Sequence, residues 1–213
     1  MYFDANTTTF AVAAFFVTIT PGNDTVLTLR NAMCGGPRDG IFTALGIGSG
    51  LFVHALLSAL GLSVILLASA ELFLAVKFVG AVYVIWLGAK SLIAALRGNG
   101  EQLSGMQDEC LAPRSSRKRF REGFLCNVLN PKVAIFYLAF LPQFITPGDP
   151  VATKSLLLAG IHCVMGVTWL AGISMGVGRA RRFVTRPFFR RAIDGVCGTI
   201  LIGLGLRLAV QER

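Results

Sequence analysis

Residues 40 to 70 contain no Asp, Glu, Lys or Arg, and this charge-free run constrains the fold more than any other feature of the sequence. A helix that crosses a bilayer needs about 20 consecutive apolar residues. The whole chain is 54% hydrophobic and 15% charged, whereas an average soluble domain has about 25% charged residues. The hydrocarbon core of a membrane contains no water to form hydrogen bonds with backbone N–H and C=O groups, and a helix satisfies these groups within its own segment. We therefore expect an all-α membrane protein.

Six apolar segments follow one another along the chain. They run over residues 10–29, 41–68, 72–96, 123–144, 151–177 and 192–210. The first segment contains Pro21 and the fourth contains Pro131, and a proline inside a helix removes a backbone donor and disrupts the preceding turn. We therefore predict six transmembrane helices, of which the first and fourth are broken. The sixth is short and carries Arg207, so five spans remain an alternative.

The positive residues are distributed unevenly between the loops. Lys and Arg gather in the connections that follow the first, third and fifth segments, and they are scarce in the second and fourth. The positive-inside rule then places the basic loops in the cytoplasm and both termini outside. The net charge of +9 is explained in this way, without a nucleic-acid partner. The first residues include Asp4 and no Lys or Arg, so we expect no signal peptide.

The chain divides into two halves of three segments each within a single membrane domain, 1–213. Repeat one covers about 1–97, a cytoplasmic basic loop about 98–122, and repeat two about 123–213. Three is an odd number, so the halves have opposite orientations, which predicts an inverted repeat. Three features recur in the same order in the two halves: Pro21 and Pro131, His54 and His162, and Leu87-Gly88-Ala89-Lys90 and Leu204-Gly205-Leu206-Arg207.

The two predicted helix breaks carry the candidate substrate-binding residues: Pro21, Gly22, Asn23, Asp24, Asn130, Pro131 and Lys132. The N-terminal end of a half-helix favours an anion and the C-terminal end favours a cation. Together with Asp24 and Lys132, two opposed breaks are suited to a small zwitterion. Alternatives are plain proline kinks, an ion pair between Asp24 and Lys132, and an Asp24 that sits in the headgroup zone.

Three residues are candidates for proton coupling: Asp24, His54 and His162. An ionisable group at membrane depth is costly and is usually functional. Each histidine is equally consistent with a packing residue that makes one hydrogen bond. The five cysteines are scattered and form no CxxC pair, so we predict no metal site, no disulfide framework and no cofactor.

Several motifs, in order and over nearly the whole length, are similar to those of the lysine and homoserine/threonine exporter (LysE/RhtB) superfamily. They are Thr20-Pro21-Gly22-Asn23-Asp24, Gly40 through Gly50 with His54, Gly80-Ala81-Val82-Tyr83 to Trp86-Leu87-Gly88-Ala89-Lys90, Phe120 with Gly123-Phe124 through Asn127, Asn130-Pro131-Lys132, and Phe140-Leu141-Pro142-Gln143-Phe144. Members commonly have a second proline where this chain has Asn23. The family motif therefore carries over onto Pro21, Gly22, Asp24, Asn130, Pro131 and Lys132.

The resemblance implies a permease of the bacterial inner membrane, not an enzyme, that exports amino acids or close derivatives and is driven by protons. Membrane lipids are further expected partners, and a homo-oligomer stays open. One alternative is a thiol–disulfide electron relay through Cys126. That relay needs a second cysteine at the equivalent place in the first half, where the sequence has Phe16. Another is a non-transporting membrane subunit whose basic loops bind lipid or a partner.

Overall fold

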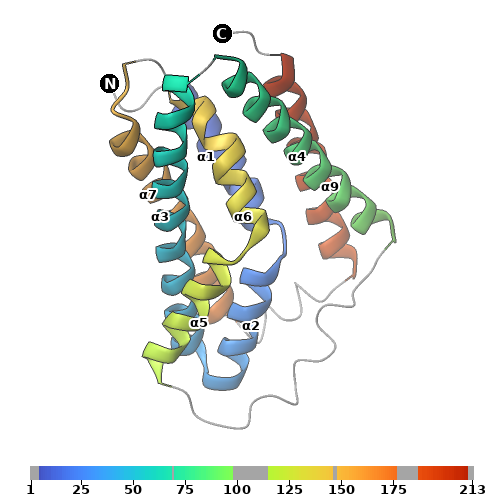
Figure 1. Ribbon diagram of the computed structural model, residues 1–213. Helices are drawn as coiled ribbons and strands as arrows, with labels where there is room; N and C mark the ends of the chain where they lie inside the picture. Colours follow the sequence, from blue (N-terminus) through green and yellow to red (C-terminus); the bar gives the residue numbers. More distant parts are fainter. Residues whose placement is uncertain (1–4, 69, 98–114, 146–147, 177–186, 211–213) are drawn as a thin grey trace.

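The computed structural model describes residues 5–68, 70–97, 115–145, 148–176 and 187–210. Every regular element in these ranges is helical and none is a strand, which confirms the all-α prediction (Figure 1). The elements are, in order, α1 (Ala5–Ile19), α2 (Asn23–Gly35), α3 (Pro37–Ala68), α4 (Ala70–Arg97), α5 (Ser116–Val128), α6 (Pro131–Ile135), the π-helix η2 (Phe136–Phe140), the 3₁₀-helix η3 (Leu141–Phe144), α7 (Val151–Met175) and α9 (Pro187–Val210).

Two helices are each long and apolar enough to cross a membrane, α3 over Pro37–Gly61 and α7 over Val151–Met175. Two bent pairs also meet this criterion when each pair is counted as one span: Thr7–Ile19 with Asn23–Gly35, and Ser116–Val128 with Pro131–Phe144. The described residues therefore supply two to four candidate spans. The third and sixth predicted segments are helical, as α4 and α9, and the count of six spans stays a prediction.

The chain turns by 53° between α1 and α2. The α-helical hydrogen bonds of α1 end with the backbone N–H of Thr20, which donates to the Phe16 carbonyl, and Pro21 has no N–H to continue the series. Gly22 then takes an extended conformation as the N-terminal cap of α2. The turn places Asp24 in the first turn of α2, where the helix dipole stabilises a carboxylate.

A turn of 51° separates α5 from the α6, η2 and η3 segment. Asn130 caps α6, because its side-chain oxygen accepts a hydrogen bond from the Lys132 N–H, and Pro131 occupies the first helical position, which proline favours. The π-helix η2 follows after one and a half turns. Such an insertion re-aims the side chains that come after it, and it is frequent at functional sites.

Glycines bring several helices into close contact. A Cβ atom on Gly46 of α3 would collide with the Phe120 carbonyl of α5, and one on Gly123 would collide with the Thr43 carbonyl of α3. Gly88 of α4 and Gly198 of α9 face each other in the same way. Figure 1 shows α4 and α9 side by side at one flank of the bundle. The small side chains thus set the spacing of both helix pairs.

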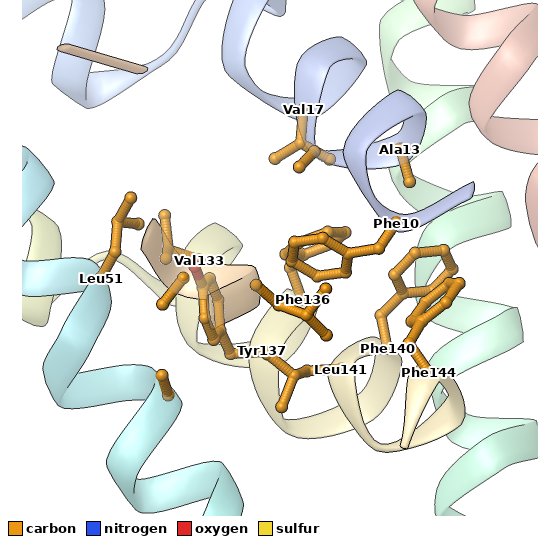
Figure 2. Packing of buried hydrophobic residues seen from close by; sticks show 14 of the residues in the cluster. Phe10, Ala13, Val17, Leu51, Val133, Phe136, Tyr137, Phe140, Leu141 and Phe144 are labelled. Atoms are coloured by element: carbon orange, nitrogen blue, oxygen red, sulfur yellow. The ribbon is translucent and has the colours of Figure 1, made fainter. Parts of the chain in front are cut away.

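An aromatic cluster fills the core beside the second bend. The rings of Phe10, Phe136, Phe140 and Phe144 lie 4.9–5.8 Å apart between centroids and are almost completely buried (Figure 2). Phe10 comes from α1, whereas the other three come from η2 and η3. The cluster fixes α1, the half-helix before the first bend, against the segment that follows the second bend.

An ion network joins α2, α3 and α5. Arg119, only 4% exposed, donates to Asp39 at 2.8 Å, to Asn31 at 2.7 Å and to Glu122 at 3.4 Å. Asn31 in turn donates to Thr43 at 2.9 Å and to Glu122 at 3.2 Å. A buried charge is stable only when it is paired in this way.

Two local features differ from the sequence predictions. The helix α5 begins at Ser116, whose predecessor Ser115 caps it, so the end of the predicted basic loop (about 98–122) and the start of repeat two at 123 fall inside a helix. The charges of the basic run interrupt the apolar pattern and so predict a loop, but the structure pairs Arg119 with Asp39 and Glu122 inside the bundle. Cys34 is disulfide-bonded, which its scattered spacing did not predict, while Cys126, Cys163 and Cys197 are free thiols.

Candidate functional site

The Asp24 carboxylate is held by the end of α5 and the linker that follows it. Its Oδ2 accepts a 3.0 Å hydrogen bond from the Asn127 amide, and its Oδ1 accepts one of 3.3 Å from the Asn130 amide. The Cys126 thiol lies 3.5 Å from the same Oδ1. Hydrogen bonds to an ionised carboxylate are stronger than those between two neutral groups, so these donors hold the Asp24 side chain in position.

The Lys132 ammonium caps the C-terminal end of α1. Its Nζ donates to the Val17 carbonyl at 2.8 Å and to the Thr20 carbonyl at 3.0 Å. The last carbonyls of a helix have no intrahelical partner, and a cation there also complements the helix dipole. Lys132 thus satisfies the acceptors that the break at Pro21 leaves open. The described contacts of Asp24 and Lys132 join each charge to the opposite bend, and none of them joins the two charges directly.

Both charged groups face one small cavity. It has a volume of about 50 Å³, enough for a few water molecules. Its polar wall comes from both bends and from α7, and its apolar wall from α1, α3, α6 and α7. The lining residues are Val17, Thr18, Thr20, Gly22, Asp24, Thr25, Ile47, Gly48, Leu51, Asn127, Asn130, Lys132, Val133, His162, Gly166 and Leu170.

Four of the seven predicted substrate-binding residues line this cavity: Gly22, Asp24, Asn130 and Lys132. The other three, Pro21, Asn23 and Pro131, do not contribute to its wall as the structure describes it, and Asn23 and Pro131 are exposed. Both prolines shape the backbone instead, since Pro21 lies between α1 and α2 and Pro131 is the first residue of α6. The binding roles of all seven residues stay predictions.

The two histidines have different surroundings. His162 lies in the cavity wall, where its Nε2 is 3.1 Å from the Thr18 hydroxyl and its Nδ1 is 3.1 Å from the Tyr137 hydroxyl. Its ring stacks on that of Tyr137 with an interplanar angle of 8°. His54 is buried beside the cavity, and its Nε2 is 3.0 Å from the Asn127 carbonyl oxygen.

Sequence reasoning missed Thr18, Asn127 and Tyr137, which hold the polar groups of the site in place. Asn127 offered one signal, because it lies only three residues before Asn130 in the sequence, close enough for both amides to reach one acceptor. Thr18 and Tyr137 offered none, since their contacts depend on how α1, η2 and α7 pack. Within the described ranges, no three His, Cys, Asp or Glu side chains come together as a metal site would require.

The chain matches the profile of the family described as LysE type translocator over residues 15–212. It is 33% identical to the uncharacterized membrane protein YrhP of Bacillus subtilis, over 94% of this chain and 96% of that one. It is 30% identical to the leucine efflux protein of Klebsiella pneumoniae, over 97% and 96% of the two chains.

A third relative is the homoserine/homoserine lactone efflux protein of Salmonella typhimurium, 26% identical over 94% of each chain. No solved structure matches the chain. The family match covers nearly the full length, and it includes both bends and the cavity between them. The chain therefore belongs to the LysE type translocators, which are membrane transporters and not enzymes.

Proposed function

We propose that this protein exports amino acids or close derivatives across the bacterial inner membrane. The observation that carries the proposal is the cavity between two helix bends, with the Asp24 carboxylate on one side and the Lys132 ammonium on the other. An amino acid presents an ammonium group and a carboxylate a short distance apart. Asp24 then binds the ammonium group, and Lys132 binds the carboxylate.

The relatives support this choice of substrate. One is named for leucine efflux and another for homoserine and homoserine lactone efflux. Leucine and homoserine each carry an amino group and a carboxylate on the same carbon, which is the part of the molecule that the two charged side chains suit. The rest of the cavity wall is left to distinguish one side chain from another.

We propose further that the chain forms six spans as two inverted repeats of three, with basic loops in the cytoplasm. The packing is consistent with this, because α3 contacts α7 and α4 contacts α9. In each pair, one helix lies against its counterpart from the other half. An inverted repeat of this kind brings the substrate site to the interface between the halves, near the middle of the membrane.

Export then proceeds by alternating access. A cavity with room for only a few waters is smaller than an amino acid with a branched side chain requires, so substrate entry needs the half-helices to separate. The substrate replaces Asn127 and Asn130 as partner of Asp24, and the Val17 and Thr20 carbonyls as partner of Lys132. Protonation of Asp24 from the outer side weakens its hold on the ammonium group and releases the substrate.

The test is transport by the purified full-length chain in liposomes. Vesicles loaded with labelled leucine or homoserine are given a proton gradient, and loss of label is followed. The Asp24→Asn variant keeps a similar size but cannot carry the negative charge, so we expect it to lose proton-driven flux. Asp149→Asn, outside the cavity wall, serves as the matched control.

Three outcomes would contradict the proposal in different ways. Absence of flux from the parent protein would favour a non-transporting subunit. Substrate flux of the same rate with and without the proton gradient would indicate a passive pathway. Unchanged proton-dependent export by Asp24→Asn would remove this carboxylate from the mechanism.

A further inference from the structure

The cavity wall contains a place without a side chain, at Gly166 in α7. Gly166 is buried and lines the cavity, yet a Cβ atom built on it meets no other atom within 4 Å. The space that a side chain at Gly166 would occupy therefore belongs to the cavity and is not filled by a neighbouring helix. Gly48, across the cavity on α3, differs, because a Cβ atom there would run into the side chains of Val167 and Cys163.

The wall around Gly166 is apolar. It is formed by side chains from four elements, namely Val17, Ile47, Leu51, Val133 and Leu170. The charges of the cavity, on Asp24 and Lys132, lie at the helix bends, and His162 is engaged with Thr18 and Tyr137. Once the two charges hold the ammonium and carboxylate groups, no ionised group of the described wall faces the substrate side chain.

We propose that Gly166 sets the upper size of the transported side chain, and that this side chain is uncharged and aliphatic. The inference rests on the proposed export function and extends it to the substrate class. The space that Gly166 leaves is available to substrate atoms when the cavity widens. A larger residue there fills the space from the α7 side and leaves both charged groups untouched.

The test compares Gly166→Ala and Gly166→Val with the parent chain in the same liposomes, using glycine, alanine, valine and leucine as labelled substrates. One methylene group in an apolar pocket changes discrimination by about 10- to 200-fold. We therefore expect Gly166→Val to lower leucine export at least about tenfold relative to alanine export. Gly166→Ala should give a smaller shift in the same direction.

Gly172 supplies the matched control. It lies in the same helix and also meets no atom within 4 Å of a built Cβ, but it is exposed and does not line the cavity. Gly172→Val should keep the parent preference among the four substrates. Stabilisation of the detergent-solubilised protein by each amino acid gives a second readout, which reports binding for any variant that inserts poorly into liposomes.

The outcomes separate the two proposals. A parent chain that transports leucine while Gly166→Val keeps the parent preference overturns the size limit alone. Equal loss of all four substrates in Gly166→Val also overturns it, because a size limit spares the small ones. A parent chain that moves and binds none of them overturns the export function and the size limit together.

Discussion

The Asn130 amide donates a 3.3 Å hydrogen bond to the Asp24 carboxylate, while the oxygen of the same Asn130 side chain accepts one from the Lys132 backbone N–H. One side chain thus links the two charged residues of the cavity. Its amide nitrogen fixes the anion that belongs to the first bend, and its oxygen caps the helix that carries the cation. Only a side chain with both a donor and an acceptor performs both tasks.

The two tasks of Asn130 can be separated by substitution. Asn130→Ser keeps an N-cap acceptor but is too short to reach Asp24, whereas Asn130→Ala loses both contacts. We expect Asn130→Ala to destabilise the protein by about 1 kcal/mol through the lost cap, and Asn130→Ser by much less. Both variants should lower export, because Asn130 then no longer holds the Asp24 carboxylate in position before the substrate binds. Thermal unfolding in detergent and liposome flux measure the two effects. Parent-level export by Asn130→Ser would show that the contact to Asp24 is dispensable.

Lys132 is predicted both to stabilise the fold and to bind the substrate. Lys132→Met keeps the length of the stem but removes the donor from the Val17 and Thr20 carbonyls. A buried acceptor left without a partner costs about 1–3 kcal/mol. We expect a lower unfolding temperature and loss of export.

Lys132→Arg retains the positive charge and should recover the stability but only part of the flux, because the guanidinium group is wider. The matched control is Lys90→Met, an exposed lysine in α4. If Lys132→Met transported at the parent rate, the carboxylate of the substrate would have to bind elsewhere.

The sequence pointed to the regions where the chain bends. Pro21 lies between α1 and α2, Pro131 is the first residue of α6, and the polar neighbours Asp24 and Asn130 lie where the next helix starts. The same local chemistry explains why Gly22 and Lys132 lie at the cavity. The aliphatic lining could not be assigned, since nearly every apolar residue of such a chain is a candidate.

Arg119 is an example of what the sequence could not provide. Within a basic run, it has the same appearance as Arg117 and Lys118, which are exposed on the same helix. What distinguishes Arg119 is the position of Asp39, eighty residues away at the start of α3. Such a contact follows from the packing of α3 against α5, in which Gly46 and Gly123 allow a close approach.

The Arg119 network gives a prediction about stability. Removal of one partner from a buried ion pair costs about 3–5 kcal/mol, because the other charge stays buried. Arg119→Ala should therefore lower the unfolding temperature of the protein in detergent strongly, and the removal of Asp39 in addition should cost little more. Arg117→Ala changes an exposed residue of the same helix and should have no measurable effect. Equal unfolding temperatures for the two arginine variants would contradict the burial of Arg119.

The two histidines are predicted to differ in whether the ring nitrogen that carries the hydrogen can change. The Nε2 of His54 faces a backbone carbonyl, which only accepts, so this nitrogen must carry a hydrogen. The partners of His162 are the hydroxyl groups of Thr18 and Tyr137, and a hydroxyl group both donates and accepts. His162 can therefore exchange which of its nitrogens is protonated without losing either contact, and it does so at the cavity wall.

We expect His162→Gln to flatten the dependence of export on external pH, whereas His54→Gln should keep that dependence even where its rate falls. Tyr137→Phe removes one of the two hydroxyl partners and should weaken the pH response in the same direction as His162→Gln. Initial efflux rates from liposomes at a series of external pH values, with the internal pH held constant, measure this response. A full pH response in His162→Gln together with a flat one in His54→Gln would reverse the assignment, because the proton would then pass through the residue whose nitrogen faces the carbonyl.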